Sequence, residues 1–352
     1  MAHFSDILRQ WYEVNRRDLP WRETRDPYLI WVSEVILQQT QVRQGLPYYF
    51  RFVERFPEVK ALAEAPEDEL LKMWEGLGYY SRARNMHAAA KRVVNELGGV
   101  FPGDYETLLT LQGTGDYTAA AVASIASGEA RAVTDGNVTR VLARYHGVTL
   151  PVDAREGAAE INRLASLLLN TEHPGLHNQA LMEFGALCCT PRNPNCPICP
   201  LLSSCFAYHH HMTSALPLKK RKPARKLRFF HFYLIEDGLH LTIEKRSHND
   251  IWKNLYQLPL LETDHPLSDS ELLNNPLLLS LCGSRPCQIT GISNTRTHEL
   301  THRRIIARFV RIQTSPLVID GHRMIINRKE IHKFAFPALI RDYLAEAGLT
   351  SR

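Results

Sequence analysis

Long apolar runs are missing from this sequence, and no stretch approaches the roughly 20 residues that a membrane-spanning helix requires. Its first residues also lack the basic-then-apolar pattern of a secretory signal, and no internal repeat is visible. The 352 residues are 44% hydrophobic and 22% charged, which is ordinary for a globular protein and enough for two domains with separate cores. We therefore expect a cytoplasmic protein of two domains that makes no contact with a membrane.

A large excess of charge of one sign is absent as well. The formal net charge is only +5. Such a mild positive charge permits a polyanionic partner but does not require one, because many enzymes carry a similar charge.

Cysteines are few, but four of the seven lie in one short segment with the spacing C-x6-C-x2-C-x5-C, at Cys189, Cys196, Cys199 and Cys205. Four prolines within and beside this segment disfavour any helix or strand there. Four thiols so close together suit one tetrahedral metal centre, either an iron–sulfur cluster or zinc. Disulfides are the competing use, and a long chain without a secretory signal argues against them. The spacing therefore predicts a metal loop and leaves iron and zinc open.

The three remaining cysteines, Cys188, Cys282 and Cys287, fall outside this spacing. In a reducing compartment they are expected to stay thiols. Cys188 ends an apolar helical stretch, so we interpret it as a buried core residue.

Apolar periodicity divides the chain into two halves of different character. Residues 1 to about 205 read as successive helices with short connections, over 28–39, 45–55, 67–75, 81–97, 117–127, 137–145, 156–169 and 175–187 after an amphipathic opening helix. Beyond 205, β-rich runs at 229–235, 239–245 and 305–312 precede a final helix at 336–347. The basic, proline-containing run before them, residues 217–228, is either a solvated linker or a strap that lies along phosphates. The pattern predicts a mainly α region followed by a smaller α+β domain.

A glycine-rich turn with Gly113 and Gly115 opens the helix expected at 117–127. Glycines let a backbone approach a ligand closely, and a helix start offers unpaired N–H groups, so the turn suits a phosphate. An ordinary turn between helices explains the same residues. No strand precedes it and the dinucleotide spacing is missing, which argues against a nucleotide cofactor.

Two carboxylates are placed where acid–base chemistry is conceivable. Asp135 precedes a predicted helix, where N–H groups and the helix dipole would keep its charge, although an N-cap role alone also accounts for it. Glu34 lies within an apolar helix, so it either faces solvent or lodges in a cleft with a raised pKa. In the second case it would be a general acid at neutral pH.

Two further segments combine residue types that suit nucleic acid. Consecutive amides at 38–41 end an apolar helix, and residues 74–84 interleave aromatic residues, glycines and arginines. An ordinary polar helix end and core packing of Trp74 are the alternatives.

Taken in order, these motifs identify a resemblance. Leu-Pro-Trp at 19–21, SEVILQQTQV at 33–42, WEGLGYYSRARN at 74–85, the glycine hairpin, Asp-Gly-Asn at 135–137 and the cysteine loop together resemble the adenine DNA glycosylases of the MutY family. That family belongs to the helix-hairpin-helix superfamily, together with endonuclease III. The resemblance covers residues 1 to about 205 and implies one [4Fe–4S] cluster on the four cysteines of the metal loop.

The resemblance also implies a role for each site residue. Glu34 would be the general acid, Asp135 would stabilise the oxocarbenium-like sugar, and residues 111–118 would grip a phosphate. The residues implied to line the adenine pocket are Trp21, Arg22 and Gln179; those implied to enter the duplex and contact the opposite base are Gln39, Leu77 and Tyr79. Tyr117 stands where strand-cutting relatives carry a lysine, so no imine can form there, and a monofunctional glycosylase is expected.

The second half resembles the Nudix-like domain that reads 8-oxoguanine opposite the adenine, through IWKNLYQLP at 251–259 and HELTH at 298–302. Thr301 and His302 would contact the lesion, and Leu300 replaces an aromatic residue of the family. The glutamate cluster of Nudix hydrolases is missing, so no pyrophosphatase activity is expected.

The expected organisation is a glycosylase domain at 1–216 with the cluster loop 189–205, a basic linker at 217–228 and a Nudix-like domain at 229–352. The expected partner is double-stranded DNA with A:8-oxoG or A:G mispairs, bound by a monomer that acts on the bacterial nucleoid. Further replication or repair proteins are left open as partners.

Overall fold

The computed structural model describes residues 4–220, 223–282, 285–317, 321 and 323–350. The chain divides into two compact units, Met1–Glu64 with Asn85–Lys222, and Ala65–Arg84 with Pro223–Arg352. Residues 65–84, which the expected boundaries assigned to the helical domain, are therefore grouped with the C-terminal part of the chain. None of the described helices is long and apolar enough to cross a membrane.

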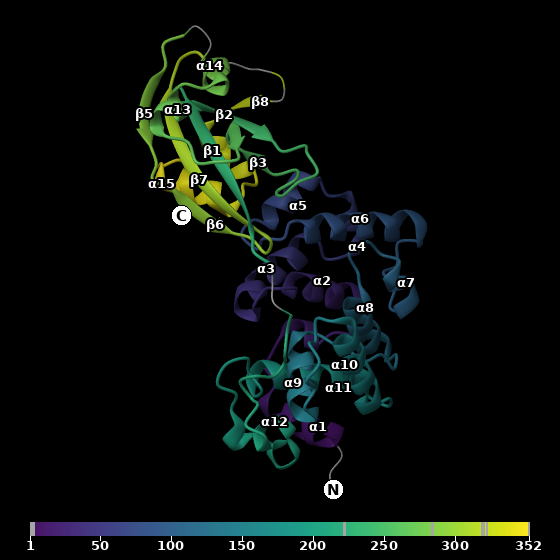
Figure 1. Ribbon diagram of the computed structural model, residues 1–352. Coiled ribbons are helices and arrows are strands. Elements are labelled where there is room, and N and C mark those ends of the chain that lie inside the picture. The colour runs from purple at the N-terminus through teal and green to yellow at the C-terminus, as the bar shows by residue number, and fades with distance from the viewer. Residues whose placement is uncertain (1–3, 221–222, 283–284, 318–320, 322, 351–352) are drawn as a thin grey trace. The chain divides into compact units, whose positions relative to one another are not determined.

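The first unit is helical (Figure 1), as the apolar periodicity predicted. Its helices are α1 (Phe4–Asn15), η1 (Pro20–Arg22), α2 (Pro27–Leu37), α3 (Val42–Arg55), α4 (Val59–Glu64), α6 (Ser81–Glu96, which starts in the other unit), α7 (Tyr105–Leu109), α8 (Asp116–Val122), η2 (Ala123–Ser127), α9 (Gly136–His146), α10 (Arg155–Leu168), α11 (Pro174–Leu187), η3 (Cys196–Ile198), η4 (Leu202–Ser204) and α12 (Phe206–His209). The short 3₁₀ helices η3 and η4 lie in the cysteine loop, where the prolines were expected to disfavour a helix. One helix was expected over 117–127, but its second half, η2, is a π-helical segment that ends at Gly128 with φ 73°.

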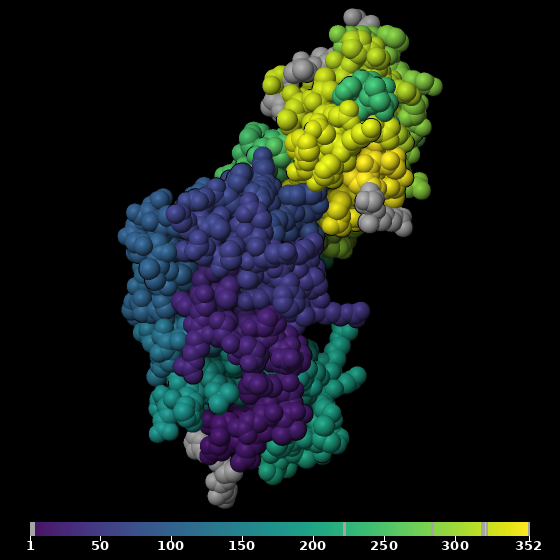
Figure 2. Space-filling model, turned by 180° about the vertical axis from the view of Figure 1, so that it is seen from behind, coloured from purple at the N-terminus to yellow at the C-terminus, as the bar shows by residue number. Residues whose placement is uncertain are grey.

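The core of this unit joins the start of the chain to helices far along it. Apolar residues of α1 recur on one face, so that Leu8 and Tyr12 are buried against α9 and α11. Figure 2 shows the purple N-terminal segment among the teal segments of the same unit. Cys188, at the end of α11, is buried in this core as expected.

The second unit contains α5 (Glu67–Met73) and an eight-stranded sheet of order β3-β2-β1-β7-β5, in which β4 pairs with β1, β6 with β7 and β8 with β2. The strands are β1 (Lys226–Glu236), β2 (His240–Lys245), β3 (Tyr256–Gln257), β4 (Leu260–Thr263), β5 (Gln288–Ile292), β6 (Arg296–Glu299), β7 (Arg303–Gln313) and β8 (Arg323–Asn327). The centre is a parallel pair, β1 and β7, in register from Lys226↔Arg303 to Glu236↔Gln313. Local periodicity does not predict this pair, because the paired residues are 77 positions apart in the sequence.

Alternate side chains of β1 enter two cores on opposite faces of the sheet. Phe230 and Phe232 pack with α15 (Ala338–Glu346), whereas Tyr233 and Ile235 pack with α13 (Asp269–Leu273) and α14 (Pro276–Cys282). Since β1 begins at Lys226, residues 226–228 of the expected linker lie in the sheet. Earlier in that linker, the Lys220 N–H donates to Asp153, and Arg221 and Lys222 lie outside the described residues.

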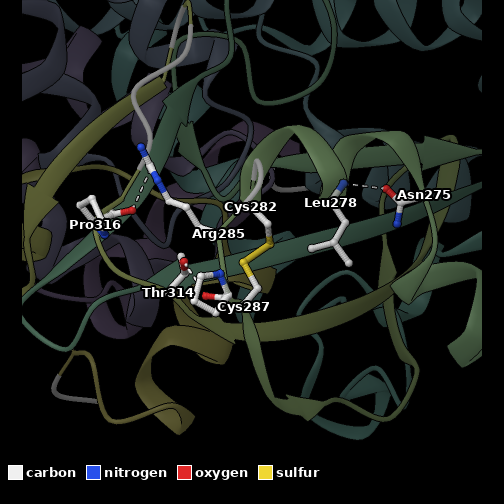
Figure 3. The surroundings of a disulfide bond; sticks show 8 residues. Asn275, Leu278, Cys282, Arg285, Cys287, Thr314 and Pro316 are labelled. Atoms are coloured by element: carbon white, nitrogen blue, oxygen red, sulfur yellow. Dashed lines mark hydrogen bonds between the residues drawn. A yellow bond between two sulfur atoms is a disulfide. The ribbon is translucent and has the colours of Figure 1, made fainter.

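The expectation that Cys282 and Cys287 are thiols is wrong, because the structure joins them in a disulfide (Figure 3). Cys282 ends α14 and Cys287 directly precedes β5, which brings their Cα atoms to 6.1 Å. Beside the disulfide, Arg285 donates a hydrogen bond to the carbonyl of Pro316.

Candidate active site

A cavity of about 160 Å³ lies within the first unit, between residues of η1, α2, α8, α9 and α11. Six residues for which the sequence suggested a role line it together: Trp21, Arg22, Glu34, Tyr117, Asp135 and Gln179. They are separated by up to 158 positions, so only folding brings them to one place. Among the described residues that line this cavity there is no lysine.

Glu34 is the buried carboxyl group of the site. It lies on α2, a helix that is buried on nearly every side, and is 7% exposed. Its pKa is raised to about 7, mainly by burial and in part by the charge of nearby Asp135, although a hydrogen bond from Tyr117 and the charge of Arg22 act in the opposite direction. The Tyr117 hydroxyl donates to Glu34 Oε2 at 2.5 Å. Near neutral pH, Glu34 thus exists partly as an acid, which is the second of the two alternatives left open above.

Asp135 caps the start of α9. Its Oδ1 accepts the N–H of Asn137 at 2.9 Å and of Val138 at 2.7 Å, and its Oδ2 accepts the Asn137 side-chain amide at 2.8 Å. The prediction of an N-cap is confirmed. Burial nevertheless raises the pKa of Asp135 above its usual value, because the loss of hydration outweighs these hydrogen bonds. The sequence suggested that helix capping would keep Asp135 charged. The structure shows that capping does not offset the effect of burial on its pKa.

The position of Asp135 depends on the close packing of α9 against α11. A Cβ added at Gly185 would lie 2.6 Å from the Asn137 Cβ, so only glycine lets the two helices approach this closely. Arg140, on α9, adds hydrogen bonds to the Gly185 carbonyl at 2.6 Å and to Asn137 Oδ1 at 2.9 Å. These contacts hold the start of α9 at the cavity wall.

The residues expected around the adenine are positioned by contacts with residues that do not line the cavity. Trp21 is 7% exposed and meets the Tyr49 ring edge-on at 5.0 Å. Gln179 accepts the Tyr12 hydroxyl at 3.1 Å, and the Arg22 guanidinium lies 5.4 Å from the centre of the Tyr12 ring. The sequence does not signal this role of Tyr12.

Glu183 is the main site residue that the sequence analysis missed. It lines the cavity with a side chain that is only 1% exposed, and it pairs with Arg22 at 2.7 Å and with Arg17 at 2.5 Å. Burial alone would raise its pKa, but the hydrogen bonds from Arg17 and Arg22 lower it to about 2. A signal was present, because Glu183 is an isolated carboxylate in an apolar helix, as Glu34 is.

The glycine hairpin lies outside the residues that line the cavity. Gly113 has φ +80° and a Cβ there would meet the Asn85 side chain at 2.6 Å, so glycine is required. Gly115 precedes α8 in an extended conformation, with open space around the position of a Cβ. Between them, Thr114 accepts the Trp31 indole N–H at 3.1 Å, which fixes the turn to α2.

The residues expected to enter the duplex also lie outside the cavity lining, and each is described within its own unit. Gln39 is exposed and left-handed, with φ 56°, just after the end of α2. Tyr79, in the second unit, is 47% exposed and also left-handed, with φ 48°. Side chains rarely adopt such φ values without a surrounding structure that enforces them, and these outliers often mark functional positions. Leu77 is only 6% exposed, so a contact with DNA would require this side chain to be uncovered.

The loop expected to read the lesion connects β6 to β7. Thr301 and His302 are exposed, whereas Leu300 packs against the core of the sheet. The Thr301 Oγ1 and the Tyr79 hydroxyl are 3.0 Å apart and share a hydrogen bond. Two residues that the sequence analysis assigned to different halves of the protein thus meet within one unit.

The four cysteines of the metal loop are free thiols of intermediate exposure. Among the described residues, no group of three or more His, Cys, Asp or Glu side chains has the arrangement of a metal site. The donor set itself fits a cluster: four thiols lie within one short loop, and the Arg144 guanidinium lies 3.4 Å from Cys189 Sγ, where its positive charge favours a thiolate. Arg144 also donates to the Thr190 and Pro191 carbonyls, which holds the start of the loop.

Comparison with known proteins agrees with this arrangement. Residues 32–165 match the HhH-GPD superfamily of base excision DNA repair proteins, and residues 231–346 match the NUDIX domain. An adenine DNA glycosylase of Buchnera aphidicola subsp. Schizaphis graminum is 36% identical over 261 residues, 74% of this chain and 75% of that protein. The chain belongs to the adenine DNA glycosylase family. It is therefore an enzyme of the hydrolase class, and its two-part fold is the one expected from the sequence.

Further comparisons agree with this family or with its fold. The adenine DNA glycosylase of Homo sapiens is 44% identical over 213 residues, which is 58% of this chain and 39% of the human protein. A thermostable thymine-DNA glycosylase has a TM-score of 0.55 at 31% identity, over 59% of this chain and 95% of its own. A non-covalent endonuclease III–DNA complex, at 23% identity and a TM-score of 0.52, shares the fold.

Proposed function

We propose that this enzyme hydrolyses the N-glycosidic bond of adenine mispaired with 8-oxoguanine or guanine in double-stranded DNA. The single observation that carries the proposal is the cavity that holds Glu34, with its pKa of about 7, together with Asp135. Its volume of about 160 Å³ suits one planar base rather than a larger ligand, since pockets for drug-sized molecules start at about 300 Å³. A base inside a duplex cannot reach such a cavity, so the adenine has to leave the stack.

Glu34 is the proposed general acid. Its neutral form gives a proton to N7 of adenine, and the electrons of the C1′–N9 bond then leave with the protonated base. Tyr117 donates to Oε2 of Glu34, which leaves Oε1 as the oxygen that carries the proton. Trp21, Arg22 and Gln179 are proposed to hold the base, and Glu183 fixes the direction of Arg22 through their ion pair.

Asp135 is the proposed stabiliser of the cation that remains. The sugar becomes oxocarbenium-like once the bond breaks, and an anionic carboxylate beside it lowers the energy of that state. Water then adds to C1′, and its proton passes to a carboxylate of the site. Because the cavity lining includes no described lysine and position 117 is tyrosine, the reaction ends at an abasic sugar without strand cleavage.

The test of this proposal is the release of free adenine from A:8-oxoG and A:G duplexes. Wild-type protein is expected to release it, and Glu34→Gln is expected to lose release while it still binds the duplex, because an amide cannot supply the proton. Glu64→Gln is the matched control, since Glu64 is an exposed glutamate of α4 whose ion pair with Lys60 is 3.9 Å long. A fully active Glu34→Gln enzyme would overturn the mechanism.

The contacts with DNA belong to the same proposal. The exposed, left-handed residues Gln39 and Tyr79 are proposed to enter the duplex, and Thr301 and His302 to contact 8-oxoguanine. The N–H groups around Gly113 and Gly115 are proposed to bind a phosphate of the backbone. Each protein molecule is proposed to act as a monomer.

We also propose that Cys189, Cys196, Cys199 and Cys205 hold one [4Fe–4S] cluster. When bound, the cluster would supply four iron–thiolate bonds that hold the loop and would take no part in breaking the glycosidic bond. Arg192, an exposed residue of that loop, is then available for a phosphate. Anaerobically purified protein is expected to contain iron and sulfide in equal amounts and to absorb visible light, and Cys199→Ser to lose both. Zinc without sulfide would contradict the proposal.

A further inference from the structure

The turn that carries Tyr79 is attached to the second unit through a short segment, residues 334–336. The Phe336 N–H donates to Glu75 Oε1 at 2.8 Å, and the Phe334 carbonyl accepts the Lys72 ammonium at 3.0 Å. Between them, the Ala335 carbonyl accepts the N–H of Tyr256 on β3 at 2.9 Å. Residues 334–336 therefore bridge the sheet and the end of α5. Ala335 bonds to the sheet, whereas Phe334 and Phe336 bond to residues at the end of α5 and in the turn after it.

The Phe336 end of this bridge is anchored rigidly. Its side chain is 2% exposed and belongs to the core that packs under the sheet. Glu75 is also largely buried, with 13% of its side chain exposed, and its Oε2 pairs with Lys72 at 2.7 Å. A charged acceptor bonded to a main-chain N–H in such surroundings makes a strong and directional bond.

A second attachment lies at the start of α5. Asp68 pairs with Lys245 of β2 at 2.5 Å through Oδ1 and accepts the Tyr256 hydroxyl at 3.0 Å through Oδ2. Nearby, Asn254 donates its side-chain amide to Glu67 at 2.6 Å. Both ends of α5 are thus attached to the sheet. These attachments also determine the position of the turn that follows α5.

The turn itself is stiff. The Trp74 indole donates to the Gly78 carbonyl at 3.0 Å, and Arg82 lies 5.2 Å from the Trp74 ring and 5.6 Å from the Tyr79 ring. The left-handed conformation of Tyr79 is strained for any residue with a side chain, so the surrounding contacts have to enforce it. A stiff turn transmits a displacement of α5 to Tyr79 and to its hydrogen bond with Thr301.

We propose that Glu75 and Asp68 are positioning residues, through which the Nudix-like sheet holds Tyr79 beside Thr301 and so sets the preference for 8-oxoguanine over guanine. This inference rests on the proposed function, because it takes Tyr79 and Thr301 as the residues that meet the base opposite adenine. Neither Glu75 nor Asp68 lines the cavity that holds Glu34 and Asp135. The preference therefore depends on contacts remote from the proposed bond-breaking residues.

The test measures binding separately from adenine release. Duplexes with 2′-fluoro-2′-deoxyadenosine, which resists hydrolysis, are prepared opposite 8-oxoguanine and opposite guanine, and the ratio of the two affinities is the readout. Glu75→Ala is expected to lower this ratio about tenfold, as loss of a charge-assisted hydrogen bond would. Glu75→Gln keeps an oxygen for the Phe336 N–H and is expected to stay within about twofold of wild type.

A charge exchange keeps the inference testable if Glu75→Ala fails to fold. Lys245→Asp faces Asp68 with a second carboxylate and is expected to lower the ratio about threefold to fivefold, a modest effect because the pair is half-exposed. Asp68→Lys combined with Lys245→Asp restores an opposite pair and is expected to recover most of the ratio. Arg163→Glu is the matched control, since it reverses an ion pair within α10 and is expected to change nothing.

The outcomes separate this inference from the proposed function. A wild-type ratio near one, or a ratio that neither Glu75→Ala nor Lys245→Asp lowers, overturns the inference whether or not adenine is released. Equal losses in Glu75→Ala and Glu75→Gln would also contradict it, because the hydrogen bond to Phe336 would then not be the cause. A protein that discriminates in binding but releases no adenine from ordinary duplexes would instead refute the proposed function.

Discussion

The Tyr117 hydroxyl donates a hydrogen bond to Glu34 Oε2 across 2.5 Å, and this contact joins two conclusions that the sequence reached separately. Tyr117 stands where a lysine would be needed for strand cleavage, and the structure shows that it also acts on the proposed acid. Its hydrogen bond lowers the pKa of Glu34, whereas burial raises it to about 7. Burial and Glu34 in turn raise the pKa of Tyr117 well above its usual value, so the phenol stays a donor.

Tyr117→Phe is expected to shift the pH dependence of adenine release. Removal of a hydrogen bond that favours the carboxylate raises the pKa of Glu34 above about 7, so the protonated acid persists to higher pH. The alkaline limb of the single-turnover rate is therefore expected to move up by about one pH unit, the equivalent of one hydrogen bond. Tyr145→Phe, which removes a hydroxyl bonded to Ser204, is the control. A limb that stays in place or moves down would contradict the assignment of Glu34.

Borohydride is expected to trap little or no covalent complex between the wild-type enzyme and DNA. Trapping requires an imine between an amine and C1′, and no described residue of the cavity lining is a lysine. Tyr117→Lys introduces an amine next to Glu34 and is expected to increase trapping on the same duplex. Gel separation of protein–DNA adducts measures both. Efficient trapping by the wild type would show that an amine from elsewhere attacks the sugar.

Glu183→Gln is expected to destabilise the helical unit by about 3 kcal/mol at pH 7, because it removes the buried partner of Arg17 and Arg22. The folded-state pKa of Glu183 is about 2, below its unfolded value of 4.5. Its contribution is therefore complete above pH 4.5 and disappears as the pH falls toward 2. Urea unfolding at pH 7 and pH 3 tests this, and the variant is expected to lose less stability on acidification than the wild type.

Glu106→Gln is the control for that experiment, since Glu106 pairs with Arg131 at 3.1 Å on the surface with 77% of its side chain exposed. A change of less than about 0.5 kcal/mol is expected. Equal effects of the two substitutions would mean that the ion pairs of Glu183 with Arg17 and Arg22 do not stabilise the unit.

Gly185→Ala is expected to impair adenine release by at least about tenfold and to cost about 1–3 kcal/mol of stability. The new Cβ would lie 2.6 Å from the Asn137 Cβ and 2.9 Å from its carbonyl oxygen, so α11 would push the start of α9 and Asp135 away. Gly291→Ala is the control, because no atom lies within 4 Å of its Cβ position. Thermal unfolding and adenine release are measured on both variants. Normal release from Gly185→Ala would show that this packing does not position Asp135.

Local chemistry made much of the helical unit predictable. Apolar periodicity and end signals located the long helices to within a few residues, as with the helix expected over 81–97 and found at Ser81–Glu96. The π-helical segment after α8 was not predicted, since its sequence of small residues carries no signal that distinguishes it from an α-helix. The parallel pairing of β1 with β7 was missed for another reason: pairing between distant segments is decided by long-range contacts rather than by local pattern.

The sequence by itself determined the family, the two-part fold and the types of side chain at the site, because the order and spacing of motifs can be recognised without a structure. The tertiary structure decided which of these residues act together. It placed Glu34, Asp135 and Glu183 around one cavity, where burial raises the pKa of the first two and the arginine hydrogen bonds lower that of Glu183. It also tied α5 and Tyr79 to the Nudix-like sheet through Glu75, although the chain order suggested that they belong to the helical domain. This grouping rests on hydrogen bonds between residues more than 250 positions apart, which form only when the chain folds.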